Sequence, residues 1–130
     1  MSWLRALAAW AAIIVLESLH GTLRQLFIAP RIGDLPARQL GVVVGSALIF
    51  VVAVAFSRAI GATTTRQQLA VGFVWVVLTV AFEVALGAAL GLSRERILSD
   101  YDVTSGGYMG FGLAFELLAP LIAARVRRVR

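Results

Sequence analysis

Two carboxylates lie near the middle of long apolar stretches of this sequence. Glu83 lies within residues 69–92 and Glu116 within residues 107–124. Both stretches are long enough to cross a bilayer at about 1.5 Å of rise per residue. A carboxylate at the centre of a spanning helix costs roughly 2.5–3.5 kcal/mol on insertion scales, so it usually faces the bundle interior and has a partner. The pattern predicts a buried polar site in which these acids bind a proton or a cation.

Glu83 shares one helical face with a hydroxyl group and two glycines. Thr79, Glu83, Gly87 and Gly91 recur at four-residue spacing, so they form a continuous stripe on a helix. Small residues in such a stripe let another helix approach closely. The stripe indicates either a binding carboxylate that lines a cavity beside Thr79, or a packing seam across which a neutral glutamate forms a hydrogen bond.

Glu116 is followed four positions later by Pro120. Proline has no N–H, so the backbone carbonyl of residue 116 loses its usual helical partner. A freed carbonyl in a membrane needs another partner or lines a polar cavity. A protonated carboxyl could donate a hydrogen bond to this acceptor, and a bound cation could bridge the acceptor and Glu116. The alternative is a packing kink with a neutral glutamate.

The first apolar stretch ends in a run of ionisable residues. Glu17, His20 and Arg24 fall on one helical face, together with Gly21. The run indicates either a proton or ligand relay, since histidine titrates near neutral pH, or a helix end whose charges pair with each other and with headgroups. Glu17 lies fourteen residues into its stretch, as Glu83 does, so both lie roughly 21 Å from the same membrane boundary. If these two helices pack together, the two carboxylates share one site.

Composition places the chain among membrane proteins. Of 130 residues, 60% are hydrophobic and 15% are charged, too few charges to coat a soluble domain of this size. The absence of cysteine excludes disulfides and thiolate sites, and the single histidine excludes two-histidine haem ligation within one chain. The basic residues are scattered through loops and ends, which indicates membrane topology rather than nucleic-acid binding. We expect no cofactor and no metal.

The apolar pattern predicts an all-α polytopic fold. Continuous apolar character, without two-residue alternation, is typical of lipid-exposed helices. The chain is expected to form a single membrane domain over residues 1–130. The expected spans are residues 3–19, 40–60, 69–92 and 107–124.

Arginine placement predicts that both termini are cytoplasmic. Four spans put the termini on one side with the loop over residues 57–66. That side carries seven arginines and the opposite side five, so dual topology stays open. The seven are Arg5, Arg58, Arg66, Arg125, Arg127, Arg128 and Arg130; the five are Arg24, Arg31, Arg38, Arg94 and Arg96.

The two loops on the opposite side differ in character. Residues 20–39 mix apolar residues with arginines and hold Pro30 and Gly33, so this segment is expected to lie at the membrane interface rather than form one long helix. Residues 93–106 indicate a short helix followed by an acidic turn. Asp100, Tyr101 and Asp102 of this turn are further candidate site residues.

Glycine pairs indicate helix association within the chain or between copies. Glycines recur four residues apart at Gly41 and Gly45, at Gly87 and Gly91, and at Gly106 and Gly110. Four short helices enclose little interior, so a useful polar cavity is expected to need a homodimer or a partner membrane protein. The lipid bilayer is the expected environment.

Three short segments resemble a group of small bacterial four-span integral membrane proteins. They are His20-Gly21-Thr22-Leu23-Arg24 with Pro30 and Gly33, Phe82-Glu83, and Asp100-Tyr101-Asp102 with Gly106-Gly107. The resemblance covers most of the chain. It implies a multi-pass protein of the bacterial cytoplasmic (inner) membrane and brings no activity with it.

These observations leave three hypotheses about function. The favoured one is a small oligomeric transporter or channel whose buried glutamates are proton or cation sites. The alternative is a non-catalytic membrane subunit or assembly factor that acts through helix packing. A lipid-modifying enzyme using His20, Arg24 and the Asp100–Asp102 turn is the least supported, because no nucleophile motif accompanies them; we expect no enzymatic activity.

Overall fold

The computed structural model describes residues 1–129, and within that range the chain is helical and without strands. Four of its helical stretches are long and apolar enough to cross a membrane, which confirms the predicted number of spans. In chain order the elements are α1 (Trp3–Leu23), a π-helical turn η1 (Arg24–Ile28), α2 (Ala29–Ile32), α3 (Asp34–Ile60), α4 (Thr65–Ala89), α5 (Arg94–Ser99), a 3-10 turn η2 (Val103–Ser105) and α6 (Met109–Val126).

The first helix is longer than the sequence pattern indicates. Helical structure continues from Trp3 through η1 and α2 to Ile32, whereas the predicted span ends at residue 19 and the predicted loop covers residues 20–39. Pro30 does not end the helix, because it lies in the first turn of α2, where a missing N–H is tolerated. Gly33, with φ of 94°, makes the turn into α3. The expected interface loop is thus a helix end and a tight turn.

Local signals fix the ends of the other helices. The Thr64 side chain accepts a hydrogen bond from the Gln67 N–H and begins α4, and Gly61, with φ of 69°, ends α3. α3 begins six residues before the predicted span and α4 four residues before it. α6 contains Pro120 yet is helical from Met109 to Val126.

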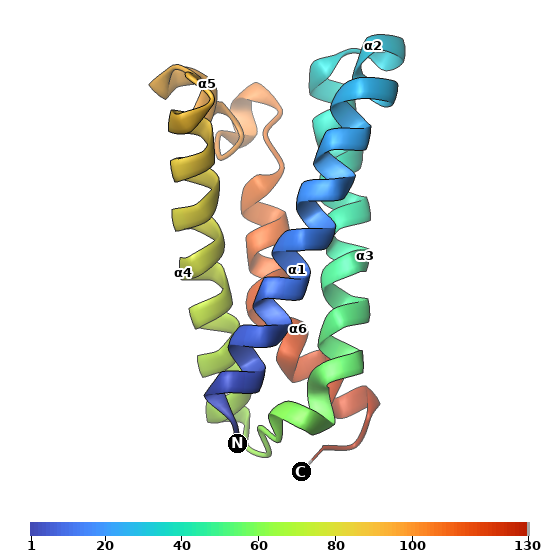
Figure 1. The fold of residues 1–130 in the computed structure, drawn as a ribbon, viewed down its shortest axis with the longest axis vertical. Coiled ribbons are helices and arrows are strands. Elements are labelled where there is room, and N and C mark those ends of the chain that lie inside the picture. The colour runs from blue at the N-terminus through green and yellow to red at the C-terminus, as the bar shows by residue number, and fades with distance from the viewer. Residues whose placement is uncertain (130) are drawn as a thin grey trace.

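The four long helices form an antiparallel bundle, with both chain ends at one end of it (Figure 1). We call this the terminal end and the opposite one, which carries α2 and α5, the distal end. α6 packs between α3 and α4, and α1 packs mainly on α3. At Gly72 a Cβ would lie 2.0 Å from the Leu117 carbonyl oxygen, so the absence of a side chain lets α4 lie directly against α6.

Trp75 is the largest side chain of the core and is 0% exposed. Its Nε1 donates to the Ala6 carbonyl of α1 at 2.9 Å, which joins α1 to α4 near the terminal end. The buried cluster around it contains Ala9, Ile13 and Ala123. The buried hydrophobic core thus includes residues of α1, α4 and α6 around Trp75.

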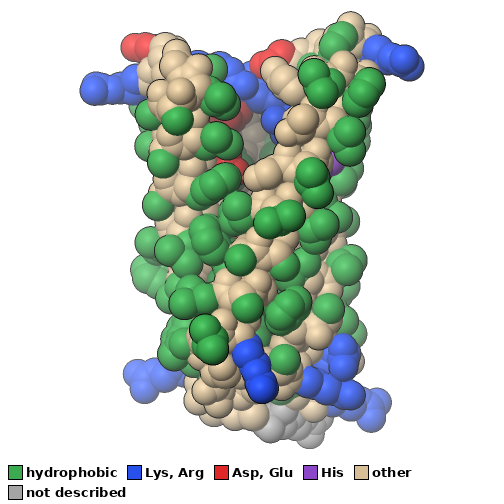
Figure 2. All heavy atoms as spheres, viewed as in Figure 1, with side chains coloured by type: hydrophobic (Ala, Val, Ile, Leu, Met, Phe, Trp, Pro, Cys, Tyr) green, Lys and Arg blue, Asp and Glu red, His purple; other side chains and the backbone are tan. Residues whose placement is uncertain are grey.

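On the visible face of the molecule, the middle is apolar and the two ends carry charged side chains (Figure 2). Hydrophobic side chains cover the visible face between the two ends, and arginines gather at both ends. Large apolar side chains such as Leu4, Val43 and Phe73 are exposed. Such a surface is unfavourable in water and matches a bilayer interior.

Candidate functional site

A hollow lies between α1 and α4 in the distal half of the bundle (Figure 2). Nearer the terminal end, two hydrogen bonds join these helices: Trp75 Nε1 donates to the Ala6 carbonyl, and Trp10 Nε1 donates to Thr79 Oγ1. Beyond these contacts they diverge (Figure 1). Acidic and basic side chains are visible inside the hollow, although the surrounding surface is apolar. In this view the hollow opens sideways, between the two helices, and charged side chains lie across its distal end.

Glu116 of α6 forms the deepest part of the polar site and is only 1% exposed. Thr79 Oγ1 of α4 donates to Glu116 Oε2 at 3.0 Å, and Trp10 Nε1 of α1 donates to Thr79 Oγ1 at 3.1 Å. Glu116 Oε1 is buried and has no hydrogen-bond partner among the described residues. Three helices therefore hold this carboxylate, and one of its oxygens remains available for a proton or a ligand.

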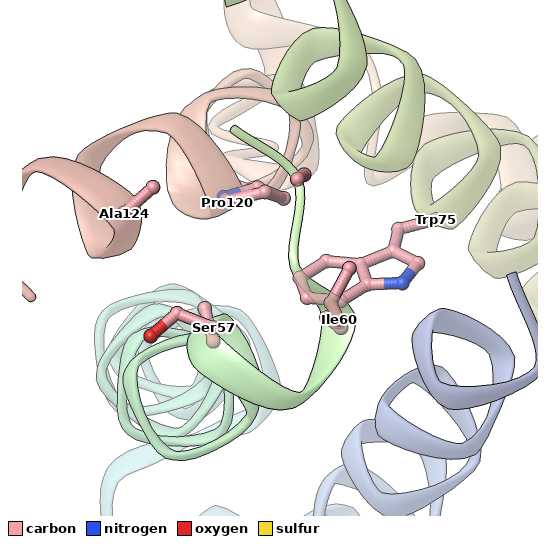
Figure 3. A pocket seen from close by; sticks show the side chains of 7 residues that line it. Ser57, Ile60, Trp75, Pro120 and Ala124 are labelled. Carbon is pink, nitrogen blue, oxygen red and sulfur yellow. The ribbon is translucent and has the colours of Figure 1, made fainter. Parts of the chain in front are cut away.

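Pro120 lies one turn from Glu116 and lines a small cavity of about 10 Å³ (Figure 3). The lining also includes Trp75, Ile60, Ala124 and Ser57, and the Ser57 hydroxyl already donates to the Val54 carbonyl. The cavity holds at most about one water and is mostly apolar. It is packing space beneath the polar site rather than a ligand site.

Glu17 of α1 lies against α3 at Gly45. A Cβ on residue 45 would lie 2.7 Å from Glu17 Oε2 and 3.0 Å from Oε1. Glu17 Oε1 is buried and has no partner among the described residues. The small residue of α3 thus makes room for a carboxylate.

His20 and Arg24 occupy the neighbouring position on the same helix pair. A Cβ on Gly41 would lie 2.9 Å from Arg24 Nη1 and 3.5 Å from His20 Cε1. The sequence pattern predicted that Gly41 and Gly45 let two helices associate. In the structure these glycines leave space for the polar side chains of Glu17, His20 and Arg24. The predicted run of Glu17, His20 and Arg24 does lie on one face of the helix, and that face meets α3.

Glu83 of α4 is half-buried and lies within electrostatic reach of this cluster. Glu17 interacts with Glu83 and with Arg24, and Glu116 interacts with both other glutamates. The site thus contains three carboxylates from α1, α4 and α6, with the Arg24 guanidinium acting on two of them. We call Glu17, Glu83, Glu116 and Arg24 the acidic cluster.

Glu83, Thr79 and the two glycines of the predicted stripe have different surroundings. Gly87 is buried, and a Cβ there would lie 2.9 Å from Ile97 Cγ1 of α5. Gly91 has φ of 76° and follows the end of α4. Thr79 and Glu83 contribute to the site, whereas the glycines accommodate α5 and the turn.

Ion pairs tie the loop that carries α5 to the start of α3. Arg38 pairs with Asp34 at 2.9 Å and also with Asp100. Arg96 pairs with Asp34 at 3.6 Å and with Asp100 at 3.4 Å. Gln39 Nε2 donates to the Gly106 carbonyl at 2.8 Å. These contacts hold residues 94–106 at the distal end; we call this segment the distal cap.

The sequence analysis did not identify Arg38, Arg96 or Asp34 as candidate residues. The signal available was the four-residue spacing from Asp34 to Arg38 and from Arg96 to Asp100, which is favourable for ion pairs on a helix. Nothing in the spacing indicates that the two pairs meet, because 62 residues separate Arg38 from Asp100.

The three candidates of the acidic turn have different roles. Asp100 joins the ion pairs of the distal cap and also acts electrostatically on Glu83. Tyr101 is half-buried, and burial together with the nearby Glu83 and Asp100 carboxylates raises its pKa. Asp102 is exposed, and its Oδ1 accepts from the Thr104 N–H at 3.0 Å and from the Thr104 hydroxyl at 2.5 Å. Asp100 and Tyr101 therefore lie within electrostatic reach of Glu83, whereas Asp102 caps its own turn.

The acidic cluster does not have the geometry of a chelating metal site. Throughout the described chain, no group of three or more histidine, cysteine, aspartate or glutamate side chains is close enough together to hold a metal ion.

Comparison of the chain with protein-family models, with curated proteins and with solved structures finds no match. The resemblance to small four-span proteins stays a prediction from the sequence. The geometry of the acidic cluster is therefore the basis for a functional proposal.

Proposed function

We propose that this protein is a small membrane transporter or channel in which the acidic cluster binds a proton or a cation. The observation that carries the proposal is the burial of Glu116 in an otherwise apolar bundle: it is 1% exposed, and its Oε1 has no hydrogen-bond partner among the described residues. Glu17 and Glu83, from two other helices, lie within electrostatic reach of it. Ionisable residues inside a membrane protein most often mark a path for protons, ions or substrates.

The charges of the cluster support this role. Three ionised carboxylates beside the single guanidinium of Arg24 would leave an excess of negative charge away from water, which is strongly unfavourable. Protons or a bound cation would remove that excess. The unpartnered oxygens Glu17 Oε1 and Glu116 Oε1 are positions at which such a species would gain contacts.

We further propose that the termini are cytoplasmic and that the hollow opens toward the outer side of a bacterial inner membrane. The support is the arginine count of seven against five, in which Arg130 lies outside the described residues. Both chain ends lie at the terminal end, as this topology requires (Figure 1).

A homodimer or a complex with a partner membrane protein remains part of the proposal. Gly41, Gly45 and Gly87 are used within the chain, so they give no support to association between copies. Gly110 is different, because a Cβ there would meet nothing within 4 Å. The alternative function, a non-catalytic subunit or assembly factor, would depend on this open part of α6.

Proteoliposome assays test the function. Purified protein is reconstituted with a trapped pH-sensitive dye, and proton movement is followed after an imposed pH or cation gradient. We expect Glu83→Gln and Glu116→Gln to lower the protein-dependent rate by at least about tenfold, because the amides cannot release a proton or balance a cation. Glu95→Gln is the matched control, since Glu95 is an exposed acid of α5.

Full retention of flux by both cluster variants would overturn the proposal and favour the packing role. Helical circular dichroism and gel-filtration behaviour in detergent establish that each variant is folded. Crosslinking in native membranes then tests the oligomeric state separately.

A further inference from the structure

The hollow between α1 and α4 opens sideways, on the apolar surface of the bundle (Figure 2). Hydrogen bonds from Trp75 to Ala6 and from Trp10 to Thr79 join the two helices, which diverge toward the distal end (Figure 1). Exposed apolar side chains lie on both helices at the level of the gap, including Leu19 on α1 and Leu86 on α4. A molecule with an apolar chain could therefore reach the cluster sideways while the chain stays in lipid.

The interior of the hollow selects for positive charge. Acidic side chains are visible in it (Figure 2). Glu83 is half-buried on α4, one of the two helices that border the hollow, and Glu116 is 1% exposed with one oxygen unpartnered. Arg24 supplies one positive charge against three carboxylates. A monocation placed among these acids would reduce the excess negative charge and gain attraction in a poorly screened environment.

The spacing of the acids favours a large cation over a metal ion. A small metal ion needs several oxygen ligands at about 2.0–2.6 Å, and among the described residues no three acidic, histidine or cysteine side chains are grouped closely enough to supply them. An alkylammonium group spreads its charge over a larger volume and binds carboxylates and aromatic faces without a fixed coordination shell. Tyr101 and Trp10 are aromatic side chains at the borders of the cluster.

We infer that the cation bound by this site is an ammonium group attached to an apolar chain, which enters from the distal half of the bilayer through the gap between α1 and α4. The inference rests on the proposed function and narrows its substrate class. The same chemistry is carried by free cationic amphiphiles and by lipids with an ammonium headgroup.

Binding measurements on the full chain in lipid nanodiscs test the inference. The probe is radiolabelled dodecyltrimethylammonium, with empty nanodiscs subtracted, and the competitors are unlabelled tetramethylammonium and an uncharged dodecyl glycoside. We expect the probe to bind saturably. We expect tetramethylammonium to compete at least about tenfold more weakly than unlabelled probe does, because it has the ammonium group but no apolar chain to bury. We expect the glycoside to compete poorly, and Glu83→Gln, unlike Glu95→Gln, to weaken binding by at least about tenfold.

Two lipid compositions separate the two sources of the ammonium group. Nanodiscs of a neutral glycolipid contain no ammonium, whereas those of phosphatidylcholine do. Equal probe affinity in both indicates a free amphiphile as the ligand. A clear loss of affinity in phosphatidylcholine indicates that the lipid headgroup itself occupies the site.

Equal competition by tetramethylammonium and the probe would overturn the inference, and this comparison needs only the unmodified protein. Probe binding that is unchanged in a folded Glu83→Gln variant would also overturn it. If the probe does not bind but glutamate-dependent proton or cation flux persists, the inference fails and the proposed function stands. If flux is also independent of the glutamates, both fail.

Discussion

Gly45 of α3 lies directly against the carboxylate of Glu17 of α1, so that a Cβ on residue 45 would come within 2.7 Å of Glu17 Oε2. Glycine pairs on membrane helices ordinarily let two backbones approach each other. Here the space is filled by an acidic side chain, and at Gly41 by Arg24. The packing of α1 on α3 and the position of the acidic cluster are therefore set by the same two glycines.

Gly45→Ala is expected to displace the Glu17 carboxylate. The added methyl group requires Glu17 to move, since a contact of 2.7 Å is closer than real Cβ atoms come. The carboxylate is the far end of a flexible side chain, so its displacement should cost little free energy of unfolding in detergent. Weaker cation-dependent flux is the expected result, because Glu17 no longer occupies its place beside α3.

Gly110→Ala is the matched control for that experiment, because it adds the same methyl group to a helix where nothing lies within 4 Å. Its stability should be unchanged or higher by up to about 1 kcal/mol. Equal effects of the two substitutions would show that loss of glycine, rather than displacement of Glu17, is responsible.

Glu116→Leu and Glu116→Gln are expected to differ in stability. Glutamine keeps an oxygen that can accept the Thr79 hydroxyl, whereas leucine leaves this buried donor unpaired and costs about 1–3 kcal/mol. Thermal unfolding in detergent measures the difference. Trp10 fluorescence reports the same change, because its indole N–H bonds to Thr79. Indistinguishable stabilities would mean that the Trp10–Thr79–Glu116 chain does not stabilise the bundle.

Arg38→Gln is expected to loosen the distal cap. Arg38 joins Asp100 of the cap to α3, and Arg96 alone would then hold the two acids. The pair with Asp34 lies within α3, so only the pair with Asp100 holds the cap. A partly exposed pair contributes about 0.2–1 kcal/mol, so its loss raises the open population by roughly 1.4- to 5-fold. Trypsin cleavage after Arg94 and Arg96 measures this opening.

The control for the cap experiment is Arg31→Gln, which removes an exposed arginine from the same end of the molecule. The difference between Arg38→Gln and the unmodified protein should shrink as salt is raised, since exposed ion pairs are screened. Cleavage that is unaffected by Arg38→Gln would indicate that backbone contacts such as Gln39 to Gly106 hold the cap.

Tyr101 gives a prediction about alkaline pH. Burial and two nearby carboxylates raise its pKa, so the folded state holds the phenol proton more tightly than the unfolded state does. This contribution to stability is complete below the ordinary tyrosine pKa of about 10 and is lost as pH rises through the higher folded value. Tyr101→Phe should therefore reduce the loss of stability between about pH 9 and 12.

Absorbance of tyrosinate near 295 nm follows the titration directly. The late-titrating phenol should disappear in Tyr101→Phe and persist in Tyr108→Phe, which removes the other tyrosine of the chain. A titration curve that Tyr101→Phe leaves unchanged would contradict the buried position of Tyr101 against Glu83 and Asp100.

The local chemistry of the chain determined much of the fold. Apolar stretches of sufficient length predict the four membrane-compatible helices, because an unpaired backbone in lipid is too costly for anything but a helix or a closed barrel. The length of the first helix could not be read in the same way. Pro30 predicts a break, but its place in the first turn of α2 after a π-helical turn lets the helix continue to Ile32.

In the candidate site too, some features could be predicted from the sequence and others could not. The position of Glu17, Glu83 and Glu116 within apolar segments is enough to predict that each is buried in the bundle or paired. The hydrogen bond from Thr79 to Glu116, the space that Gly45 leaves for Glu17 and the ion pair of Arg38 with Asp100 arise only from the packing of the folded chain. Helical periodicity relates residues a few positions apart, whereas these contacts join different helices and depend on how the helices pack against one another.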